Sequence, residues 1–422
     1  MAFFFSRDTK VFMSWSYDGT AAKTALYEIP VLDGFSFSQG TNTSEVTLSE
    51  AANSTGGSKR GRAMFTDSFA PAEWSFSTYM RPTVSGSGSA TTATDGVTNG
   101  QHGGNADKFA IEGPLWAAMS ANTYDRATGA SSSDKSDYEP NVFNFANSNQ
   151  VTLGVFDLYF VLGASKDSEG NTYTTGTDGV TVYKLADCSV GSASIDFDIE
   201  GLAQIAWSGN GKTVEEVASL ETRATDSGNS ITGTTTLGIV NEGISSTSNY
   251  IRQKLTDLAI SFDVSASTGT LGALNVDGND VTYNVTLTGG NITIENNLTY
   301  LTPETLGSVN LPLGHVMGTR SVSGNFTCYL NDTANSSLDL FERLQESRGV
   351  ITNAFDLAFS IGGSGNTPRC VVDIDKAHLE LPAHSFEDVV SVDVAFHGLS
   401  TDLSSATAAN ATNEVKLTYT AS

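Results

Sequence analysis

The sequence predicts a mainly β protein of the α+β class, built from two tandem copies of one unit. Apolar and polar residues alternate with period two over many short stretches, which is typical of half-buried strands. In addition, four sequence blocks recur in the same order along the 422-residue chain, which indicates an internal duplication. A chain of this length also fits two domains of about 200 residues better than a single core.

The recurring blocks are strand-like and carry aromatic residues at matching positions. The clearest match is "FDLYFVLG" (156–163) with "FDLAFSIG" (355–362), each followed later by a short Ala-aromatic-X-Gly block (206–209 and 395–398). The two remaining matches are "WSFSTYMRP" (74–82) with "GNFTCYLND" (324–332), and "YEIPVLDGFSF" (27–37) with "YNVTLTGGNITI" (283–294).

Each copy is also expected to contain one short helix between its strands. Residues 105–119 have apolar side chains at partly helical spacing, although Gly113-Pro114 is expected to break that helix. Residues 336–349 form a clearer amphipathic pattern that ends at Gly349. The order of strands, helix and strands predicts an antiparallel sheet or sandwich in each copy.

The domain boundaries follow from the repeat and from two polar insertions in the first copy. The segment 209–250 is long and polar, and we expect it to contact other subunits because ordering it costs conformational entropy. The expected organisation is a first domain (1–215, with loop insertions 83–104 and 120–140), a linker or assembly arm (216–250) and a second domain (251–422).

The composition excludes several classes of function. The 22 basic and 47 acidic residues give a net charge of −25, which argues against tight binding of nucleic acid. Charged residues make up 16% of the chain, so the surface must be built largely from Ser, Thr, Asn and Gly. The three cysteines are too few and too scattered for a disulfide framework or a zinc site. No segment approaches 18 consecutive apolar residues, so no membrane span is expected.

Candidate chemical sites are few, and each has a simpler structural interpretation. "AWSGNGKT" (206–213) ends like a phosphate-binding loop but has Ala206 where the pattern requires Gly, so a plain turn is favoured. His378 and His384 could share a strand face as metal ligands, but no third ligand lies nearby in the sequence. "LNVDGNDVTYN" (274–284) suggests calcium, but a hairpin turn fits better. We therefore expect no catalytic, cofactor or metal site.

Acidic residues line one face of a predicted strand. In "SIDFDIE" (194–200), Asp196, Asp198 and Glu200 alternate with apolar residues, so they should share one face. Asp393 in "VSVDVAF" (390–396) lies in the corresponding region of the second copy. A solvated outer face is the simplest interpretation of each strand taken alone.

Longer stretches of both copies resemble the tail tube proteins of long-tailed bacteriophages. In the first copy they are "VLDGFSFSQGTNTSEVTLSEA" and "RGRAMFTDSFAPAEWSFSTYMRP", and in the second "TLGSVNLPLGHVMGTRSVSGNFTCYL". The resemblance implies two tandem tail-tube-like β-barrel or sandwich domains, each with a short flanking helix. In that family, four strands per domain join neighbouring domains into a continuous barrel around a lumen.

The resemblance implies a structural protein of the virion and no enzyme. Such proteins polymerise into stacked rings that form the tail tube, through which genomic DNA is ejected. A fused two-domain chain would form trimeric, pseudo-hexameric rings. The implied partners are copies of the chain itself and other tail proteins: a tape measure, a terminator, a baseplate or tail tip, and a sheath where the tail has one. DNA would pass without tight binding, no membrane would be involved, and assembly would take place in the host cytoplasm.

Within this interpretation Asp196, Asp198, Glu200 and Asp393 are expected to line the lumen, where carboxylates repel the phosphates of passing DNA. Two other classes of function stay open from the sequence. A viral or cell-surface β-sandwich adhesin would place exposed aromatic residues in the insertions, which hold Tyr124 and Tyr138. An enzyme on a β scaffold would need a polar cluster in one copy that the other copy lacks.

Overall fold

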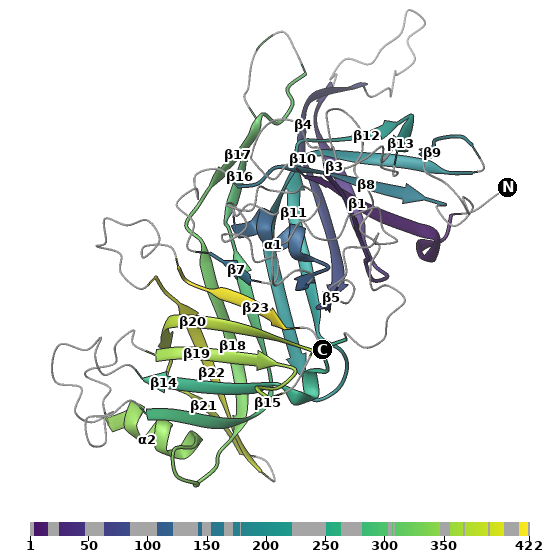
Figure 1. Cartoon of the computed structure of the whole chain (residues 1–422). Coiled ribbons are helices and arrows are strands. Elements are labelled where there is room, and N and C mark those ends of the chain that lie inside the picture. The colour runs from purple at the N-terminus through teal and green to yellow at the C-terminus, as the bar shows by residue number, and fades with distance from the viewer. Residues whose placement is uncertain are drawn as a thin grey trace, which may run out of the picture.

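The computed structural model describes residues 4–15, 25–46, 63–84, 108–120, 142–145, 153–163, 172–177, 179–221, 250–262, 281–302, 306, 309–346, 355–365, 368–386, 389–400 and 413–420. These residues form a mainly β protein with two lobes, one from each half of the chain (Figure 1). The described part of the first half ends at Glu221, and that of the second half begins at Tyr250. Most of the insertions expected at 83–104 and 120–140 and most of the arm expected at 216–250 lie outside the described residues.

A barrel of six strand positions closes within the first half. Strand β1 pairs with β8, β8 with β10, β10 with β11, β11 with β4, and β4 with β3. Strand β2 pairs with β1 and is followed in the chain by β3. Together β2 and β3 occupy the sixth strand position and close the barrel. The bounds are β1 (Thr9–Trp15), β2 (Ala25–Ile29), β3 (Ser36–Val46), β4 (Ala63–Tyr79), β8 (Phe156–Leu162), β10 (Thr181–Asp198) and β11 (Gln204–Gly211).

A six-stranded barrel also closes within the second half. Its strands pair in the order β14, β15, β18, β22, β20 and β19, and β19 returns to β14. The bounds are β14 (Asp257–Phe262), β15 (Val281–Glu295), β18 (Ser321–Tyr329), β19 (Phe355–Ile361), β20 (Arg369–Leu379) and β22 (Val390–Gly398).

Short elements complete both halves. In the first half these are η1 (Ser6–Asp8), β5 (Pro82–Val84), β6 (Lys108–Ala110), α1 (Gly113–Ser120), β7 (Val142–Asn144), β9 (Thr172–Thr174), β12 (Thr213–Val217) and β13 (Ser219–Glu221). In the second half they are η4 (Gln253–Leu255), β16 (Leu298–Leu301), β17 (Gly314–Met317), α2 (Ser337–Glu346), β21 (Ala383–Phe386) and β23 (Lys416–Thr420). Because β12 and β13 pair with β10 and β9, the chain stays in the first lobe up to Glu221.

The strands pair in the same order in the two halves. Strand β8 lies between β1 and β10, and β19 lies between β14 and β20. The register of the β8–β10 ladder shifts between Leu185 and Cys188 of β10. The register of the β19–β20 ladder shifts at the matching place, between Ile374 and Ala377 of β20. The segments 156–163 and 355–362 therefore occupy matching positions.

The match expected between 206–209 and 395–398 is wrong by two residues. When Phe76 is matched with Phe326, the partner of Ala72 is Gly211 and the partner of Val322 is Gly398. Gly211 therefore corresponds to Gly398. A Cβ on Gly211 would lie 2.9 Å from Cys188 Sγ and 3.8 Å from Ala72 Cβ, and one on Gly398 would lie 3.0 Å from the Val322 side chain.

The two helices differ from what the sequence predicts. Helix α1 begins at Gly113 with Pro114 in its first turn, so Pro114 starts the helix and does not break one. Proline suits this position because the first N–H groups of a helix have no partner inside the helix. Residues 108–110, expected to be helical, form β6. Helix α2 spans Ser337–Glu346, close to the expected 336–349.

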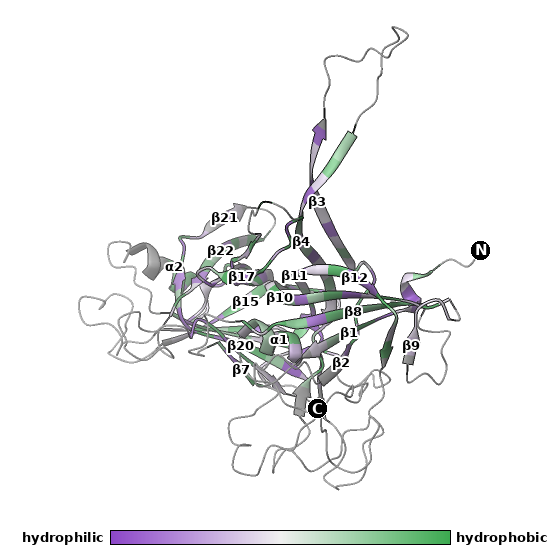
Figure 2. Ribbon diagram, turned by 90° about the horizontal axis from the view of Figure 1, so that it is seen from above, coloured by the Kyte–Doolittle hydropathy of each residue, from purple (hydrophilic) through white to green (hydrophobic). Residues whose placement is uncertain are grey.

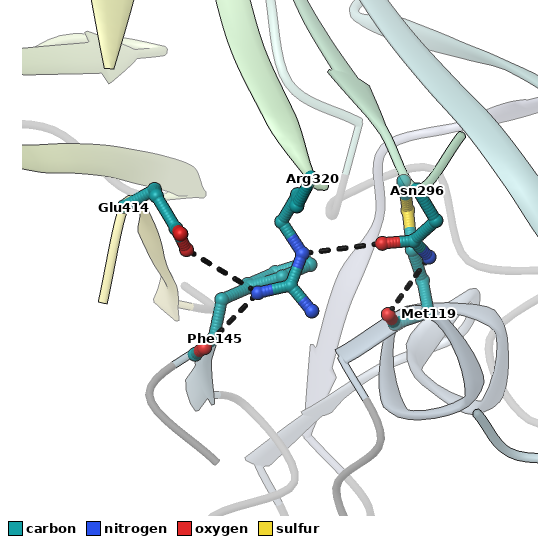
Figure 3. Close-up of polar contacts among 5 residues, drawn as sticks. All are labelled: Met119, Phe145, Asn296, Arg320 and Glu414. Carbon is teal, nitrogen blue, oxygen red and sulfur yellow. Dashed lines mark hydrogen bonds and ion pairs between the residues drawn. The ribbon is translucent and has the colours of Figure 1, made fainter. Parts of the chain in front are cut away.

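A buried polar network joins the two halves next to α1 (Figure 3). The Arg320 guanidinium donates to Asn296 Oδ1 (3.1 Å) and to the carbonyl of Phe145 (3.1 Å), and lies 3.4 Å from Glu414 Oε2. Asn296 Nδ2 in turn donates to the carbonyls of Met119 (3.1 Å) and Val190 (3.2 Å). Removing one partner from such a network leaves buried polar groups unpaired, which is strongly destabilising.

Two hairpins extend away from the barrels. Strands β3 and β4 project from the body as a paired ribbon (Figure 2). Strands β16 and β17 pair with each other, and Asn310 between them lies beside β4, where its carbonyl accepts a hydrogen bond from Phe69 N–H (2.9 Å). Exposed apolar side chains gather on both hairpins: Met64, Phe65, Leu301, Leu306, Val309, Leu311, Leu313 and Val316. Among the described residues no helix is both long and apolar enough to cross a bilayer.

Candidate functional site: the polar face of a continuous sheet

Strand pairing across the junction joins the two halves into one sheet. The segment 192–198 of β10 pairs antiparallel with residues 289–295 of β15, from Ser192 opposite Glu295 to Asp198 opposite Gly289. The resulting strand order is β3, β4, β11, β10, β15, β18, β22 and β21. The long strands that connect the two lobes are part of this sheet (Figure 1).

One face of the sheet is apolar and packs against the barrel cores. Following the pairing across six strands, one row consists of Phe76, Trp207, Ala193, Ile294, Val322 and Gly398. All of these residues are buried. Alternation along each strand places these side chains on the core side.

The opposite face is polar and built largely from small neutral side chains. One row across it consists of Ser77, Ala206, Ser194, Thr293, Ser323 and His397, and the next of Tyr79, Gln204, Asp196, Asn291, Asn325 and Ala395. Hydroxyl groups bond across the strands, for example Ser36 Oγ with Ser75 Oγ (2.8 Å). The surface is therefore hydrated but weakly charged.

The charge that this face carries is negative. Over the strand segments 36–46, 63–79, 189–198, 204–211, 281–295, 321–329, 383–386 and 390–398, the sequence contains no Lys or Arg. Exposed acids on the polar face are Glu73, Asp196, Asp198, Glu295 and Asp393. A face of this kind repels phosphate and offers no cation to hold it.

Three of the four acids expected in the lumen share this polar face. Asp196 and Asp198 are exposed on β10. Asp393 is exposed on β22, and its Oδ1 accepts hydrogen bonds from Asn325 Nδ2 (3.2 Å) and Thr327 Oγ1 (3.3 Å). Asn325 is a residue that sequence reasoning missed, although its position in the alternating stretch of β18 could have indicated it.

Glu200 lies off the strand. Strand β10 ends at Asp198, whose carboxylate accepts the N–H of Ile199 (2.6 Å), and the chain turns at Gly201 with φ of 103°. Ile199 is 49% exposed, so the alternation that placed Glu200 on the same face has ended there. The expectation that Glu200 is a strand residue is therefore wrong.

The other candidate sites take simple structural positions. Residues 206–211 belong to β11 and 213–217 to β12, so the turn expected at 206–213 is mostly strand. His378 pairs across the sheet with His397, and His384 pairs with Val392. No group of three metal-ligating side chains occurs within the described part of the chain. Residues 274–280 of the calcium-like stretch lie outside that part.

Comparison with known proteins identifies the family. The family model described as "Phage tail tube protein" matches residues 82–398. This chain belongs to the phage tail tube protein family. It is 29% identical over 401 residues to "Tail tube protein pb6" of Escherichia phage T5, and the match covers 94% of this chain and 73% of that relative.

Solved structures give a weaker likeness. Two gene transfer agent chains, from "Virion of native gene transfer agent (GTA) particle" and from the tail of an empty particle, match at 15% and 16% identity with TM-scores of 0.22. Each match covers 33% of this chain and 89% of the other.

Family membership assigns the chain to the tail of a phage virion, as a structural protein of mainly β fold. It favours the tube function over the adhesin that the sequence left open, and the family is not one of enzymes.

Proposed function

We propose that three copies of this chain close into a ring, that rings stack into a tube, and that the polar face of the continuous sheet lines its lumen. The observation that carries the proposal is the β10–β15 pairing, which joins two barrels edge to edge within one chain. Repeating the same joint between chains extends the sheet around a closed ring.

The two ends of the sheet are the counterparts of the two strands that meet at this joint. Ser36 pairs with Ser75 as Asn291 pairs with Asn325, so β3 corresponds to β15. Ser385 pairs with Ser391 as Asp196 pairs with Gln204, so β21 corresponds to the end of β10. Within the described chain, neither β3 nor β21 forms a ladder on its second edge.

The register of the joint between chains follows from this correspondence. Asp196 lies opposite Asn291 within the chain, so Ser385 of one chain should lie opposite Ser36 of the next. Pro382 precedes β21 and carries no N–H, which limits uncontrolled pairing of this edge before assembly.

The polar face is the one that can line a narrow bore. The rest of both barrels lies on the apolar face, and a closed ring has more room for that bulk outside than inside. Each chain contributes two barrels, so three chains supply six sectors with pseudo-sixfold symmetry. An acidic lumen without Lys or Arg lets DNA pass without binding tightly.

Stacking of rings would use the two projecting hairpins. Leu306 is fully exposed, and Leu313, Met64 and Phe65 are each at least 60% exposed. Exposed apolar side chains in this number indicate a contact surface. We propose that they pack on the ring above or below, and that tape measure, terminator and tip proteins contact the ends of the tube.

The test is a disulfide between chains. Double substitution Ser36→Cys with Ser385→Cys should give covalent trimers under oxidising conditions, because residues directly opposite in a ladder lie within disulfide range. Ser38→Cys with Ser385→Cys, displaced by two residues on the same face, is the matched control and should cross-link poorly. Equal cross-linking of both pairs, or monomers alone from tubes seen by negative-stain microscopy, would refute the register.

A further inference from the structure

An open pocket of about 420 Å³ lies beside α2 in the second half of the chain. It is lined by Thr286, Tyr329, Leu330, Asn331, Asp332, Leu338 and Val389. Tyr329 is 39% exposed and Val389 is 55% exposed, so apolar surface is open to solvent there.

The same place in the first half is filled by the chain itself. The ring of Tyr250 packs edge-on against that of Tyr79, with centroids 5.2 Å apart, and the Arg81 guanidinium lies 4.3 Å from the Tyr250 ring. Next to them, Ala203 N–H donates to the carbonyl of Ile251 (2.9 Å). Leu202 forms a bridge with Arg252.

Backbone contacts establish that the two places correspond. Met80 N–H donates to the carbonyl of Ala203 (2.9 Å), and Leu330 N–H donates in the same way to Val390 (3.0 Å). Tyr329 therefore matches Tyr79, and Val389 matches Leu202. No described segment of the second half takes the place that 250–252 takes in the first, and the pocket is open there.

The counterpart of 250–252 lies at the N-terminus of the chain. The 3-10 helix η4 leads into β14 as η1 leads into β1, and the shared pairing of these strands matches Ile251 with Phe4 and Arg252 with Phe5. A Cβ on Gly362 would lie 3.0 Å from Ile251, and one on Gly163 would lie 3.4 Å from Phe4. Each residue therefore packs on the same turn of its own barrel.

What differs is the covering on the other side. Ile251 is 1% exposed because the preceding barrel covers it, whereas its counterpart Phe4 is 48% exposed. Arg252 and its counterpart Phe5 both lie at the surface, and Phe5 is 52% exposed. The N-terminus and α2 lie at opposite ends of the molecule, so one chain cannot bring them together (Figure 1). The chain therefore exposes two aromatic side chains at one end and a partly apolar pocket at the other.

We propose that the N-terminal segment of one chain, through Phe4 and Phe5, docks in the Tyr329–Val389 pocket of the neighbouring chain. The contact would repeat between chains what Tyr250–Arg252 do within the chain. This proposal rests on the proposed ring. It adds a second contact between neighbouring chains, which is formed by side chains, whereas the sheet joint is formed by backbone hydrogen bonds. Buried aromatic anchors of this kind carry a large share of interface affinity.

The first experiment is a cross-link with a matched internal control. Phe5→Cys with Val389→Cys should join neighbouring chains, whereas Leu202→Cys with Arg252→Cys, the equivalent pair, should form a disulfide within one chain. The native Cys188, Cys328 and Cys370 are buried and should not interfere. If Ser36→Cys with Ser385→Cys links the chains but Phe5→Cys with Val389→Cys does not, the docking is refuted while the ring stands. If both pairs fail, the ring itself is refuted.

The second experiment measures assembly. Phe4→Ser with Phe5→Ser should raise the protein concentration at which tubes form by about tenfold or more, because the lost contacts are apolar anchors. Phe4→Leu should retain most of the assembly, since it keeps the apolar contact. The melting temperature of the unassembled chain should stay unchanged, because both rings are half exposed in it. Unaltered assembly of the double Ser variant would overturn the proposal.

Discussion

Helices α1 and α2 occupy matching places in the chain order of the two halves, yet their surroundings differ. All eight residues of α1 are buried and none is charged, whereas α2 places Leu340 and Phe341 on the core and has charged residues elsewhere. Helix α1 lies between the two lobes, and α2 lies at the edge of the second (Figure 1). The two barrels thus share a strand order, whereas the helices beside them differ: α1 is buried between the lobes and α2 lies at the surface.

The difference shows how the joint inside the chain is stabilised. Trp116 of α1 packs against Trp207 with ring centroids 4.6 Å apart, and its indole N–H donates to Tyr419 Oη of β23 (2.8 Å). Strand β23 belongs to the second half and also pairs with β7 of the first. The covalent joint has a packed core, whereas a joint between identical chains must be formed by surfaces that are soluble beforehand.

Trp116→Ala should cause the largest loss of stability. Removing a fully buried Trp typically costs about 3–5 kcal/mol, and here Tyr419 would lose its donor as well. Leu338→Ala on the half-buried face of α2 is the matched control and should cost about 1 kcal/mol. Chemical denaturation of the unassembled chain measures both. Similar losses in the free energy of unfolding for the two variants would show that α1 contributes no more to stability than α2.

Arg320→Met should destabilise the chain by about 3 kcal/mol, because it leaves the half-buried Glu414 and the buried Asn296 beside an apolar side chain. Adding Glu414→Gln should recover part of the loss, since the remaining buried group then carries no charge. Denaturation of the single and double variants gives the coupling free energy. A double variant as unstable as the sum of the two single variants would mean that the pair does not interact.

Glu112 makes the joint sensitive to pH. Its carboxylate accepts a hydrogen bond from the backbone N–H of Arg81 (3.3 Å), and complete burial raises the pKa of Glu112 to about 7. A pKa raised on folding favours the protonated form in the native state, so stability is highest below the unfolded value of about 4.3 and falls as the pH rises towards 7. Glu112→Gln should remove that fall and be more stable than the parent at pH 8, by up to about 3 kcal/mol.

The measurement is the free energy of unfolding at pH 5 and pH 8 for the parent and for Glu112→Gln. His384→Gln on the edge strand β21 serves as a control outside the joint within the chain, provided that unassembled chains are measured. A parent protein that is equally stable at both pH values, or a Gln variant with the same pH dependence, would contradict the assignment to Glu112.

Local patterns predicted the strands and their faces better than they predicted ends and pairing. The alternation at 194–198 placed Asp196 and Asp198 together correctly, but it could not show that the turn at Gly201 removes Glu200. The apolar patch before Gly113 predicts a helix but forms a strand, because strand and helix patterns overlap in short segments. Pairing of β10 with β15 depends on backbone edges of strands nearly 100 residues apart, which leave no local signal.

The two-residue error in matching 206–209 with 395–398 has the same origin. An Ala-aromatic-X-Gly block recurs in both halves, but a strand is defined by its partners, and the ladders match Gly211 with Gly398. Bulges shift the count of residues without changing the pattern of faces. The duplication and the domain boundaries remain predictions that the common pairing order supports.

The smallest effect on stability is expected for the exposed acidic residues of the polar face. Replacing Asp196, Asp198 and Asp393 by Lys should change the free energy of unfolding by no more than about 1 kcal/mol per site, since all three are exposed and the hydrogen bonds lost at Asp198 and Asp393 can be replaced by water. If that face lines the bore, the change creates rings of positive charge at every layer. Tubes of the variant should then retain DNA at low salt and release it as salt increases. Glu200→Lys, in the turn beyond the strand, is the matched control and should retain less. Tubes of the triple variant that hold no more DNA than the parent at low salt would place the polar face on the outer wall.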